Sequence, residues 1–374
     1  MKEHVTELRI VRAKGDPYAR GVTVGHELRD LINESVDFYH RYLHRRGVSS
    51  VELQDLLTPY LVAAETVYPD YMATMKGMSA GATVPVLELF AINAFEELEP
   101  LLESPEGGLL FLQRKEGYVR APDGPPVRSE RCSSFSVVTP SRTMLAHNEH
   151  WLAGDIGNVA VVIDIPEGNG VAVASPTVVC CLPAVGINGH RGAQGIGSLA
   201  ATDDGVGMPR VLVSRSALEA VDPTDAVDRA AVPGRAGGYG HVFAFSGGRA
   251  LTVETTAELV AVHEGPGAHT NHYLAPELAE IAPEASEGSS ARHRRLTELI
   301  DQRRPEAVED VMGILRDHGS APQAICLHPE EDEGEEASAV MFSMVADLDD
   351  GRMWVAAGNP CENDYEEIDL SGVL

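Results

Sequence analysis

The chain changes character near residue 132, and this change constrains the fold more than any other feature. Before it, apolar residues recur at helical spacing, as in the run from Leu28 to Tyr42, and Gly47 follows as a stop signal. After it, β-prone runs follow one another with turn residues between them. Because helical and strand patterns stand in separate runs, the sequence predicts an α+β fold.

Turn and cap signals place the expected elements. An opening strand precedes the first helix, and Ser50 can cap a second helix, which Pro59 can kink. Strands are expected at residues 135–138, 144–148, 158–165, 170–179, 340–346 and 353–357, and further helices at residues 209–220, 290–300 and 305–317.

A segment rich in Gly, Pro and charged residues separates the two halves. Between Glu103 and Arg131 it contains the run Pro122-Asp123-Gly124-Pro125-Pro126, which continues neither a helix nor a sheet. We interpret it as an exposed connector. The chain then divides into a mainly helical segment, residues 1–131, and a strand-rich segment, residues 132–374, which we expect to be parts of one folded unit.

Composition limits the classes of partner. A net charge of −28 disfavours binding to nucleic acid or to anionic membranes, because phosphate recognition needs clustered Lys and Arg. The acidic run from Glu330 to Glu336 is interpreted as a solvated loop. The first fifteen residues contain no long apolar run, so a cytoplasmic location without a membrane anchor is expected. The five cysteines are an odd number and are expected to be free thiols.

The segment that begins at Cys132 predicts a β-hairpin. Pro140 presets a turn between two β-prone arms, so antiparallel pairing brings Cys132 close to the run Asn148-Glu149-His150. A loop of two or four residues would pair Cys132 with Glu149. A loop with an odd number of residues would pair it with Asn148 or His150.

This neighbourhood has the residue types of nucleophilic catalysis. A thiol near an amide, a carboxylate and an imidazole supplies a nucleophile, an orienting group and a donor for an oxyanion. Cys132 also follows directly on the connector. An enzyme that exposes its nucleophile as a new N-terminus would place it there.

Several groups of residues resemble one family in their order along the chain. They are Lys76-Gly77-Met78-Ser79-Ala80-Gly81-Ala82 with Asn93 and Glu96-Glu97-Leu98, then Cys132-Ser133-Ser134-Phe135 and Ala146-His147-Asn148-Glu149, then Gly186-Ile187-Asn188, Ser198 to Asp204 and Pro209-Arg210, then His269-Thr270-Asn271-His272, Arg294, and Ile325-Cys326 near His328-Pro329. In this order the chain resembles the penicillin acyltransferase (acyl-coenzyme A:6-aminopenicillanic acid acyltransferase) family of cysteine N-terminal-nucleophile hydrolases.

The resemblance implies a four-layer αββα sandwich and an autoprocessing zymogen. The Arg131–Cys132 bond would be cleaved autocatalytically, and the two resulting chains would stay associated. The freed α-amino group of Cys132 would then be the base, since its reference pKa of about 7.7 to 8.0 leaves a neutral fraction at neutral pH. By the same resemblance Asn271 helps to stabilise the oxyanion. The expected catalytic residues are Cys132, Asn271, His150 and Asn148.

The expected substrates are small N-acyl compounds or amines, with an acyl thioester as a further acyl donor, and the mechanism needs neither metal nor cofactor. Whether water or an amine accepts the acyl group stays open, because both use the same acyl-enzyme. Two residues depart from the family pattern. Arg131 stands where a small or acidic residue is usual, and His150 where Asp is usual.

Two other functions remain as alternatives. The chain could be a metal-dependent amidohydrolase that uses a thiol with His147, His150, His269 and His272. Against this, His147 and His150 are three residues apart on an expected strand, so their side chains point to opposite faces. The chain could also be a binding protein that kept the fold and lost catalysis.

Overall fold

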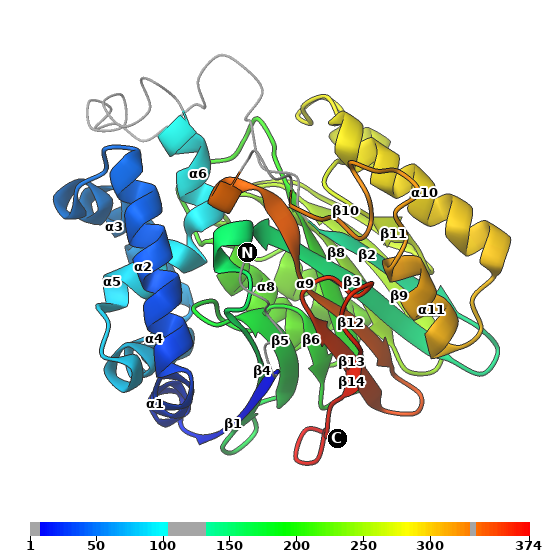
Figure 1. Ribbon diagram of the computed structural model, residues 1–374, viewed down its shortest axis with the longest axis horizontal. Coiled ribbons are helices and arrows are strands. Elements are labelled where there is room, and N and C mark those ends of the chain that lie inside the picture. Colours follow the sequence, from blue (N-terminus) through cyan, green and yellow to red (C-terminus); the bar gives the residue numbers. More distant parts are fainter. Residues whose placement is uncertain (1–7, 104–131, 330–333) are drawn as a thin grey trace.

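The computed structural model describes residues 8–103, 132–329 and 334–374. Two β-sheets pack face to face in the middle of the molecule, with helices on the outside of both (Figure 1). The Pro- and Gly-rich connector with Arg131, and residues 330–333 of the acidic run, lie outside the described residues. Within the described ranges, no helix is long and apolar enough to cross a membrane.

The first helices lie together at one side of the strands, in blue and cyan in Figure 1. The side chain of Ser49, one residue before the expected cap, accepts a hydrogen bond from the backbone of Glu52, and Glu52 accepts one from the backbone of Ser49, so the pair forms a capping box. Pro59 lies inside the same helix without ending it. The helices are α1 (Pro17–Glu27), α2 (Arg29–Arg45), α3 (Ser50–Val67), α4 (Pro69–Ala82), α5 (Val86–Asn93) and α6 (Phe95–Glu103).

The first sheet has eight strands in the order β1-β4-β5-β6-β7-β8-β9-β10. Its first pair, β1 and β4, is parallel, and the other pairs are antiparallel. The strands are β1 (Arg9–Gly15), β4 (Val159–Pro166), β5 (Val173–Val178), β6 (Gly186–Asn188), β7 (Gly192–Leu199), β8 (Gly238–Phe245), β9 (Arg249–Thr255) and β10 (Val260–Glu264).

The second sheet has six antiparallel strands in the order β11-β2-β3-β12-β13-β14. Its β2 lies between β11 and β3, although β11 is far from both in sequence. The strands are β2 (Ser133–Val138), β3 (Thr143–Leu152), β11 (Ala268–His269), β12 (Ser338–Asp347), β13 (Arg352–Ala357) and β14 (Glu366–Glu367).

Later helices cover the outer face of each sheet. Small residues of α8 (Arg210–Leu218) and α9 (Pro223–Ala230) pack on aromatic and aliphatic residues of β8 and β9. On the other side, α10 (Glu287–Arg303) and α11 (Val308–Leu315), yellow and orange in Figure 1, bury leucine and valine side chains against β2, β3 and β12. The α+β fold with four αββα layers is therefore confirmed.

The expected strands at residues 135–138, 144–148, 158–165, 170–179, 340–346 and 353–357 are present as β2, β3, β4, β5, β12 and β13. The sequence pattern does not predict β7 and β8, because glycines interrupt their apolar residues. These glycines allow residues of the second sheet to approach the backbone of β7 and β8 closely. A Cβ atom at Gly197 would lie 2.3 Å from the carbonyl oxygen of Thr270, and one at Gly240 would lie 2.2 Å from the ring of His269.

Buried ion pairs join the helices of residues 8–103 to the strand-rich segment. Arg20 of α1 and Arg215 of α8 contact the two oxygens of Asp164 in β4 at 2.5 and 2.7 Å. In α6, Glu97 accepts a hydrogen bond of 2.7 Å from the fully buried Arg210. Buried charges need such partners, because an unpaired charge out of water is costly.

Candidate active site

The hairpin of β2 and β3 has a four-residue turn. Val138 pairs with Thr143, and in the turn Thr139 N donates to Arg142 O over 2.8 Å. Ser133 pairs with Asn148, so the register continued by one residue sets Cys132 opposite Glu149, the partner expected for a four-residue loop. The Cys132 thiol donates a hydrogen bond of 3.1 Å to Glu149 Oε1.

A chain of hydrogen bonds leads away from this contact. The other carboxylate oxygen, Oε2 of Glu149, lies 2.9 Å from His147 Nε2, and His147 Nδ1 lies 2.9 Å from Ser134 Oγ. Ser134 donates its proton to the carbonyl of Ile196 at 3.2 Å, so its oxygen accepts from His147 Nδ1. His147 Nε2 and Glu149 then hold one proton between them. The sequence pattern does not predict this pairing of His147 with Glu149.

The surroundings of Cys132 keep its thiol protonated. Burial raises the pKa of Cys132 well above its usual value, and the charge of Glu149 raises it further, whereas the backbone N–H of His150 acts in the opposite direction. A thiol in this state becomes a nucleophile only when a base takes its proton. Its backbone is also unusual, because Cys132 has a positive φ of 79°.

A mostly apolar pocket opens beside the thiol. Cys132 and Glu149 contribute polar atoms to its wall, and Glu96 of α6 contributes another carboxylate. Most of the remaining lining is apolar and comes largely from both sheets, as with Trp151, Val178, Ile196 and Phe342. Such a pocket fits an apolar group that is attached to a polar reacting centre.

Asn271 lies near the same end of β2 as Cys132. Asn271 follows the end of β11 by two residues, and in β11 His269 pairs with Ser134, which follows Cys132 by two residues. Its Nδ2 donates to Ser198 O at 3.3 Å, and Ser198 lines the pocket. Its Oδ1 accepts a hydrogen bond of 2.7 Å from Arg292. Arg294, which the family resemblance indicates, is exposed, whereas Arg292, which no sequence pattern indicates, is buried in α10.

The structure places the side chains of Asn148 and His150 on the other face of β3. Asn148 Nδ2 donates to Leu315 O and Ile325 O at 3.0 and 2.9 Å, and His150 Nε2 donates to Ile325 O at 3.1 Å. Burial lowers the pKa of His150 well below its usual value, and the charge of Arg292 lowers it further. Of the four expected catalytic residues, Cys132 therefore lines the pocket and Asn271 contacts Ser198 of its wall, whereas the side chains of Asn148 and His150 lie on the other face of β3.

The histidines considered as metal ligands lie in separate places. His147 and His150 point to opposite faces of β3, as the strand argument predicts. His269 contacts the buried Glu254 at 2.7 Å, and His272 contacts Ser289 at 2.7 Å. A smaller donor set does exist at this site, because the donor atoms of Cys132, His147 and Glu149 lie within 4.8 Å of one another.

Comparison with known proteins identifies the family. The profile of the acyl-coenzyme A:6-aminopenicillanic acid acyl-transferase family matches residues 137–362. Among solved structures, penicillin V acylase from Agrobacterium tumefaciens is similar with 11% identity and a TM-score of 0.42, over 64% of this chain and 86% of that one. A mutant of conjugated bile acid hydrolase from Clostridium perfringens is similar with 12% identity and a TM-score of 0.38, over 64% of this chain and 92% of that one.

The family match spans more than half of the chain and includes the last two residues of β2, all of β3 and the segment from Asn271 to Cys361. The resemblance that the motif order indicates is thereby confirmed. The chain belongs to the acyl-coenzyme A:6-aminopenicillanic acid acyl-transferase family and is an enzyme of the N-terminal-nucleophile class of amidohydrolases and acyltransferases.

Proposed function

We propose that Cys132 is the nucleophile of an amidohydrolase or acyltransferase, and that cleavage of the Arg131–Cys132 bond activates it. One observation carries the proposal. The Cys132 thiol, directly before the first residue of β2, contacts the Glu149 carboxylate at 3.1 Å in the wall of an apolar pocket. A nucleophile, a proton acceptor and a binding site for an acyl group thus lie together.

Self-cleavage would begin at the thiol. Glu149, assisted by His147, takes the thiol proton, and the sulfur attacks the carbonyl carbon of Arg131. The carbon–nitrogen bond then breaks, and the nitrogen of Cys132 takes up a proton and becomes an α-amine, which leaves Arg131 as a thioester on the sulfur. Water hydrolyses the thioester to the carboxylate of Arg131 and the free thiol.

The backbone of Cys132 favours this step. A residue with a side chain at positive φ costs on the order of 1 to 3 kcal/mol, and Cys132 has φ 79°. Breaking its peptide bond to Arg131 removes the constraint that joins the two residues. Part of the strain would therefore be released as the bond breaks.

Turnover would use the new α-amine as the base. The amine takes the thiol proton, the thiolate attacks the carbonyl carbon of the substrate amide, and the protonated amine then gives its proton to the leaving nitrogen. The resulting thioester on Cys132 is resolved by water or by an acceptor amine. A group with a reference pKa of about 7.7 to 8.0 suits both transfers near neutral pH.

Asn271 would stabilise the oxyanion. Its amide lies beside the end of β2, and its Nδ2 faces Ser198 O, next to the pocket that Cys132 lines. A donor at such a position lowers the barrier by roughly 3 to 4 kcal/mol in other acyl-transfer enzymes. In this arrangement Arg292 orients the amide.

The pocket favours a substrate with an apolar acyl group. Its lining is mostly aliphatic and aromatic, and Glu149 is a polar group of the lining in contact with Cys132. An N-acyl amine or an acyl thioester would place the acyl chain in the pocket and its carbonyl at the sulfur. The family is described as an acyl-transferase family, which agrees with this class of substrate.

After cleavage the two chains would stay together. The pairs of Asp164 with Arg20 and of Arg210 with Glu97 join the two segments and are buried. Separation of the segments would leave these charges without their partners, at a cost of about 3 to 5 kcal/mol for each broken buried pair. Glu96 of the smaller chain would remain in the wall of the pocket.

Intact mass tests the proposal on the full-length purified protein. Cleavage before Cys132 gives fragments of about 14 and 26 kDa, in proportion to residue number in a chain of 40.0 kDa, and the larger fragment begins with Cys132. We expect Cys132→Ala to stay in one piece and the control Cys180→Ala to be cleaved. A wild-type chain that stays full length yet hydrolyses N-acyl amines would contradict the α-amine mechanism. One that stays full length and inactive would favour the binding-protein alternative.

A metal-dependent hydrolase is the second candidate, because Cys132, His147 and Glu149 have donor atoms within 4.8 Å of one another. In that case chelation would stop turnover and added zinc would restore it. The measurement is turnover by chelated protein whose circular dichroism is unchanged. Full activity of such protein, with loss on alkylation of Cys132, supports the thiol mechanism.

A further inference from the structure

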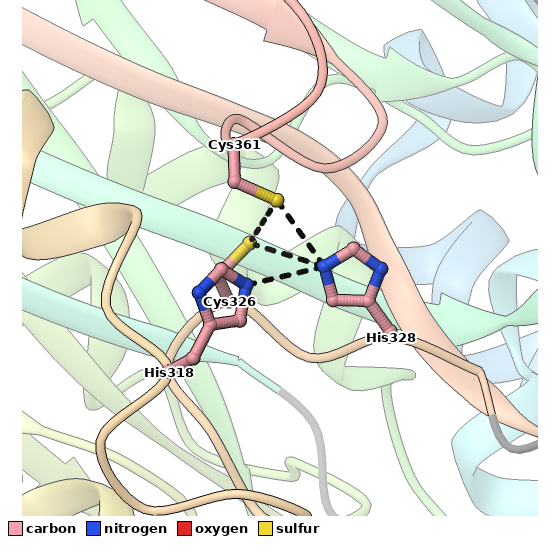
Figure 2. Close-up of side chains that lie close together, drawn as sticks. All are labelled: His318, Cys326, His328 and Cys361. Carbon is pink, nitrogen blue, oxygen red and sulfur yellow. Dashed lines mark hydrogen bonds between the residues drawn. The ribbon is translucent and has the colours of Figure 1, made fainter.

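Four thiol and imidazole side chains meet at one point away from the active-site pocket. They are His318, Cys326, His328 and Cys361, and Figure 2 shows their sulfur and nitrogen atoms turned toward one another. The first three come from the segment that follows α11, and Cys361 comes from the turn after β13. The four donor atoms all lie within 4.8 Å of one another.

The distances between these atoms fit the edges of a tetrahedron around one zinc ion. Bonds of about 2.3 Å to sulfur and 2.0 to 2.1 Å to nitrogen give edges of about 3.8 Å between sulfurs, 3.6 Å between sulfur and nitrogen, and 3.3 Å between nitrogens. The two sulfurs are 3.4 Å apart and the two Nε2 atoms 3.2 Å apart. His328 Nε2 lies 3.2 Å from Cys361 Sγ and 4.0 Å from Cys326 Sγ.

We propose that His318, Cys326, His328 and Cys361 form a structural zinc site. Two thiolates and two imidazoles are a ligand set that selects Zn²⁺ over harder cations such as Mg²⁺ and Ca²⁺. Four protein ligands complete a tetrahedron and leave no position for water or substrate, so the site stabilises the fold and takes no part in acyl transfer.

Neighbouring groups hold the ligands in place. Asn359 Nδ2 donates to Cys326 Sγ at 3.4 Å, the kind of hydrogen bond that a zinc-bound thiolate accepts. Glu362 Oε1 lies 3.8 Å from His328 Nδ1, the ring nitrogen that faces away from the other ligands. Arg316 Nε donates to Pro360 O at 2.8 Å and so ties the two segments that supply the ligands. The site is therefore largely formed by contacts within the protein.

The site would also steady the strand that carries Glu149. Cys326 follows Ile325, whose carbonyl accepts hydrogen bonds from Asn148 Nδ2 and His150 Nε2 of β3. Zinc would fix the position of Ile325, and with it the anchor for both side chains. The expected effect on the enzyme is thus indirect, through the fold.

Zinc content of the full-length protein tests the assignment. Protein purified without chelators should contain about one equivalent of zinc per chain, because a closed site has four ligands for a single ion. The double variant Cys326→Ala/Cys361→Ala should lose it. Cys132→Ala is the matched control, since it removes the thiol of the other donor group, Cys132 with His147 and Glu149, and should keep its zinc.

Cobalt substitution tests the geometry without any variant. Wild-type protein that is stripped of metal and loaded with Co²⁺ should show the intense visible bands of a tetrahedral ion and a thiolate charge-transfer band. Zinc should displace both. The same bands in Cys132→Ala, which lacks the thiol of the other donor group, assign the metal to this cluster even if the double variant fails to fold.

Three results would overturn the proposal. Zinc that is retained by the double variant and lost from Cys132→Ala would place the metal at the active site. Wild-type protein that takes up neither Zn²⁺ nor Co²⁺ when fully reduced would leave the cluster without a metal function. A Cys326–Cys361 disulfide in protein purified under air without reductant, seen as a mass lower by two hydrogens, would make the pair a redox bridge instead.

Discussion

Arg292 donates a hydrogen bond of 2.7 Å to Oδ1 of Asn271 and thereby fixes which way the amide points. A guanidinium has donors and no acceptor, so it selects the oxygen of the amide. Nδ2 is left facing Ser198 O, beside the pocket. A buried arginine in α10 thus turns the amide donor of Asn271 toward Ser198, a residue of the pocket wall.

We expect Arg292→Lys to lower kcat by about 10- to 100-fold with a smaller change in KM. The shorter ammonium cannot hold the amide in the same way, and one oxyanion donor is worth roughly a factor of 100 to 1000 in kcat. Steady-state kinetics give the result, and the exposed Arg294→Lys is the control. Equal losses in both variants, or a change confined to KM, would contradict an orienting role.

Glu149→Gln should slow self-cleavage by about 100- to 10,000-fold, the usual contribution of a general base. Whether the variant cleaves more slowly or faster separates two effects of the Glu149 carboxylate, its action as a base and its negative charge. Its charge raises the pKa of Cys132, so removal of that charge alone would favour the thiolate and speed cleavage. Conversion to fragments over time measures the rate. Glu167→Gln, at an exposed glutamate, is the control, and faster cleavage in Glu149→Gln would rule out the base.

His150 should make the fold less stable in acid. Its pKa in the folded chain lies well below 6.5, so the unfolded chain binds one more proton once the pH falls below that value. Its share of the unfolding free energy is intact above about pH 6.5 and drops by about 1.4 kcal/mol per pH unit below it. Gln can still donate to Ile325 O.

Urea unfolding of the wild type and of His150→Gln at several pH values measures this share. The difference between the two proteins should change with pH below about 6.5 in favour of the variant. A constant difference would show that His150 does not titrate between the folded and unfolded states.

Asp155 should have the opposite pH dependence. Burial raises its pKa from 3.8 to about 6, so the folded chain holds a proton that the unfolded chain has lost. The contribution of Asp155 to the free energy of unfolding is complete below about pH 4. It falls by about 3 kcal/mol as the pH rises through 6. Asp155→Asn should remove this loss, because the amide can still accept from Asn158 Nδ2 and donate to Ser35 Oγ.

The measurement is again urea unfolding, at pH values between about 4 and 7, the range in which this carboxyl titrates. Asp37→Asn, at an exposed residue of α2, is the control and should follow the wild type. If Asp155→Asn is no more stable than the wild type at neutral pH, burial of this carboxyl has no net cost.

The apolar pocket predicts a chain-length dependence for the acyl group. With one amine and a series of linear acyl chains, kcat/KM should rise about fourfold per methylene, equivalent to about 0.8 kcal/mol, until the pocket is full. Steady-state rates on the cleaved enzyme supply the series. A flat series would show that the acyl chain binds outside this pocket.

The sequence predicts those strands and helices that local residue patterns determine. It does not predict those that depend on packing between distant parts of the chain. Strands β2 to β5 have β-prone residues and turn signals, and the parity of the turn after Val138 limits the partners of Cys132. Strands β7 and β8 contain glycines that only the approach of the second sheet explains. Helical spacing alone also cannot tell that Arg292 points inward while Arg294 points to solvent.

The Cys and His cluster also depends on contacts between distant parts of the chain, which the sequence alone does not predict. His318, Cys326 and His328 are close in sequence, but Cys361 joins them only because the turn after β13 lies against the segment that follows α11. The histidines expected as alternative metal ligands are near Cys132 and Asn271 in the sequence, and this cluster contains none of them. Which donors meet depends on tertiary contacts over a long sequence separation, and no local spacing reports them.

In the order β11-β2-β3, a new chain end at Cys132 would start an inner strand of the sheet, which is uncommon for a newly cut end. Newly cut ends normally fray, because few contacts hold them. Here Ser133 and Ser134 pair with β3, and Ser134 also pairs with His269 of β11 on the other edge. An amine released at this point would be next to residues that are paired with strands on both sides. The distance between this amine and the thiol would then vary little until the neighbouring strands separate. Heat inactivation should therefore coincide with unfolding of the sheet.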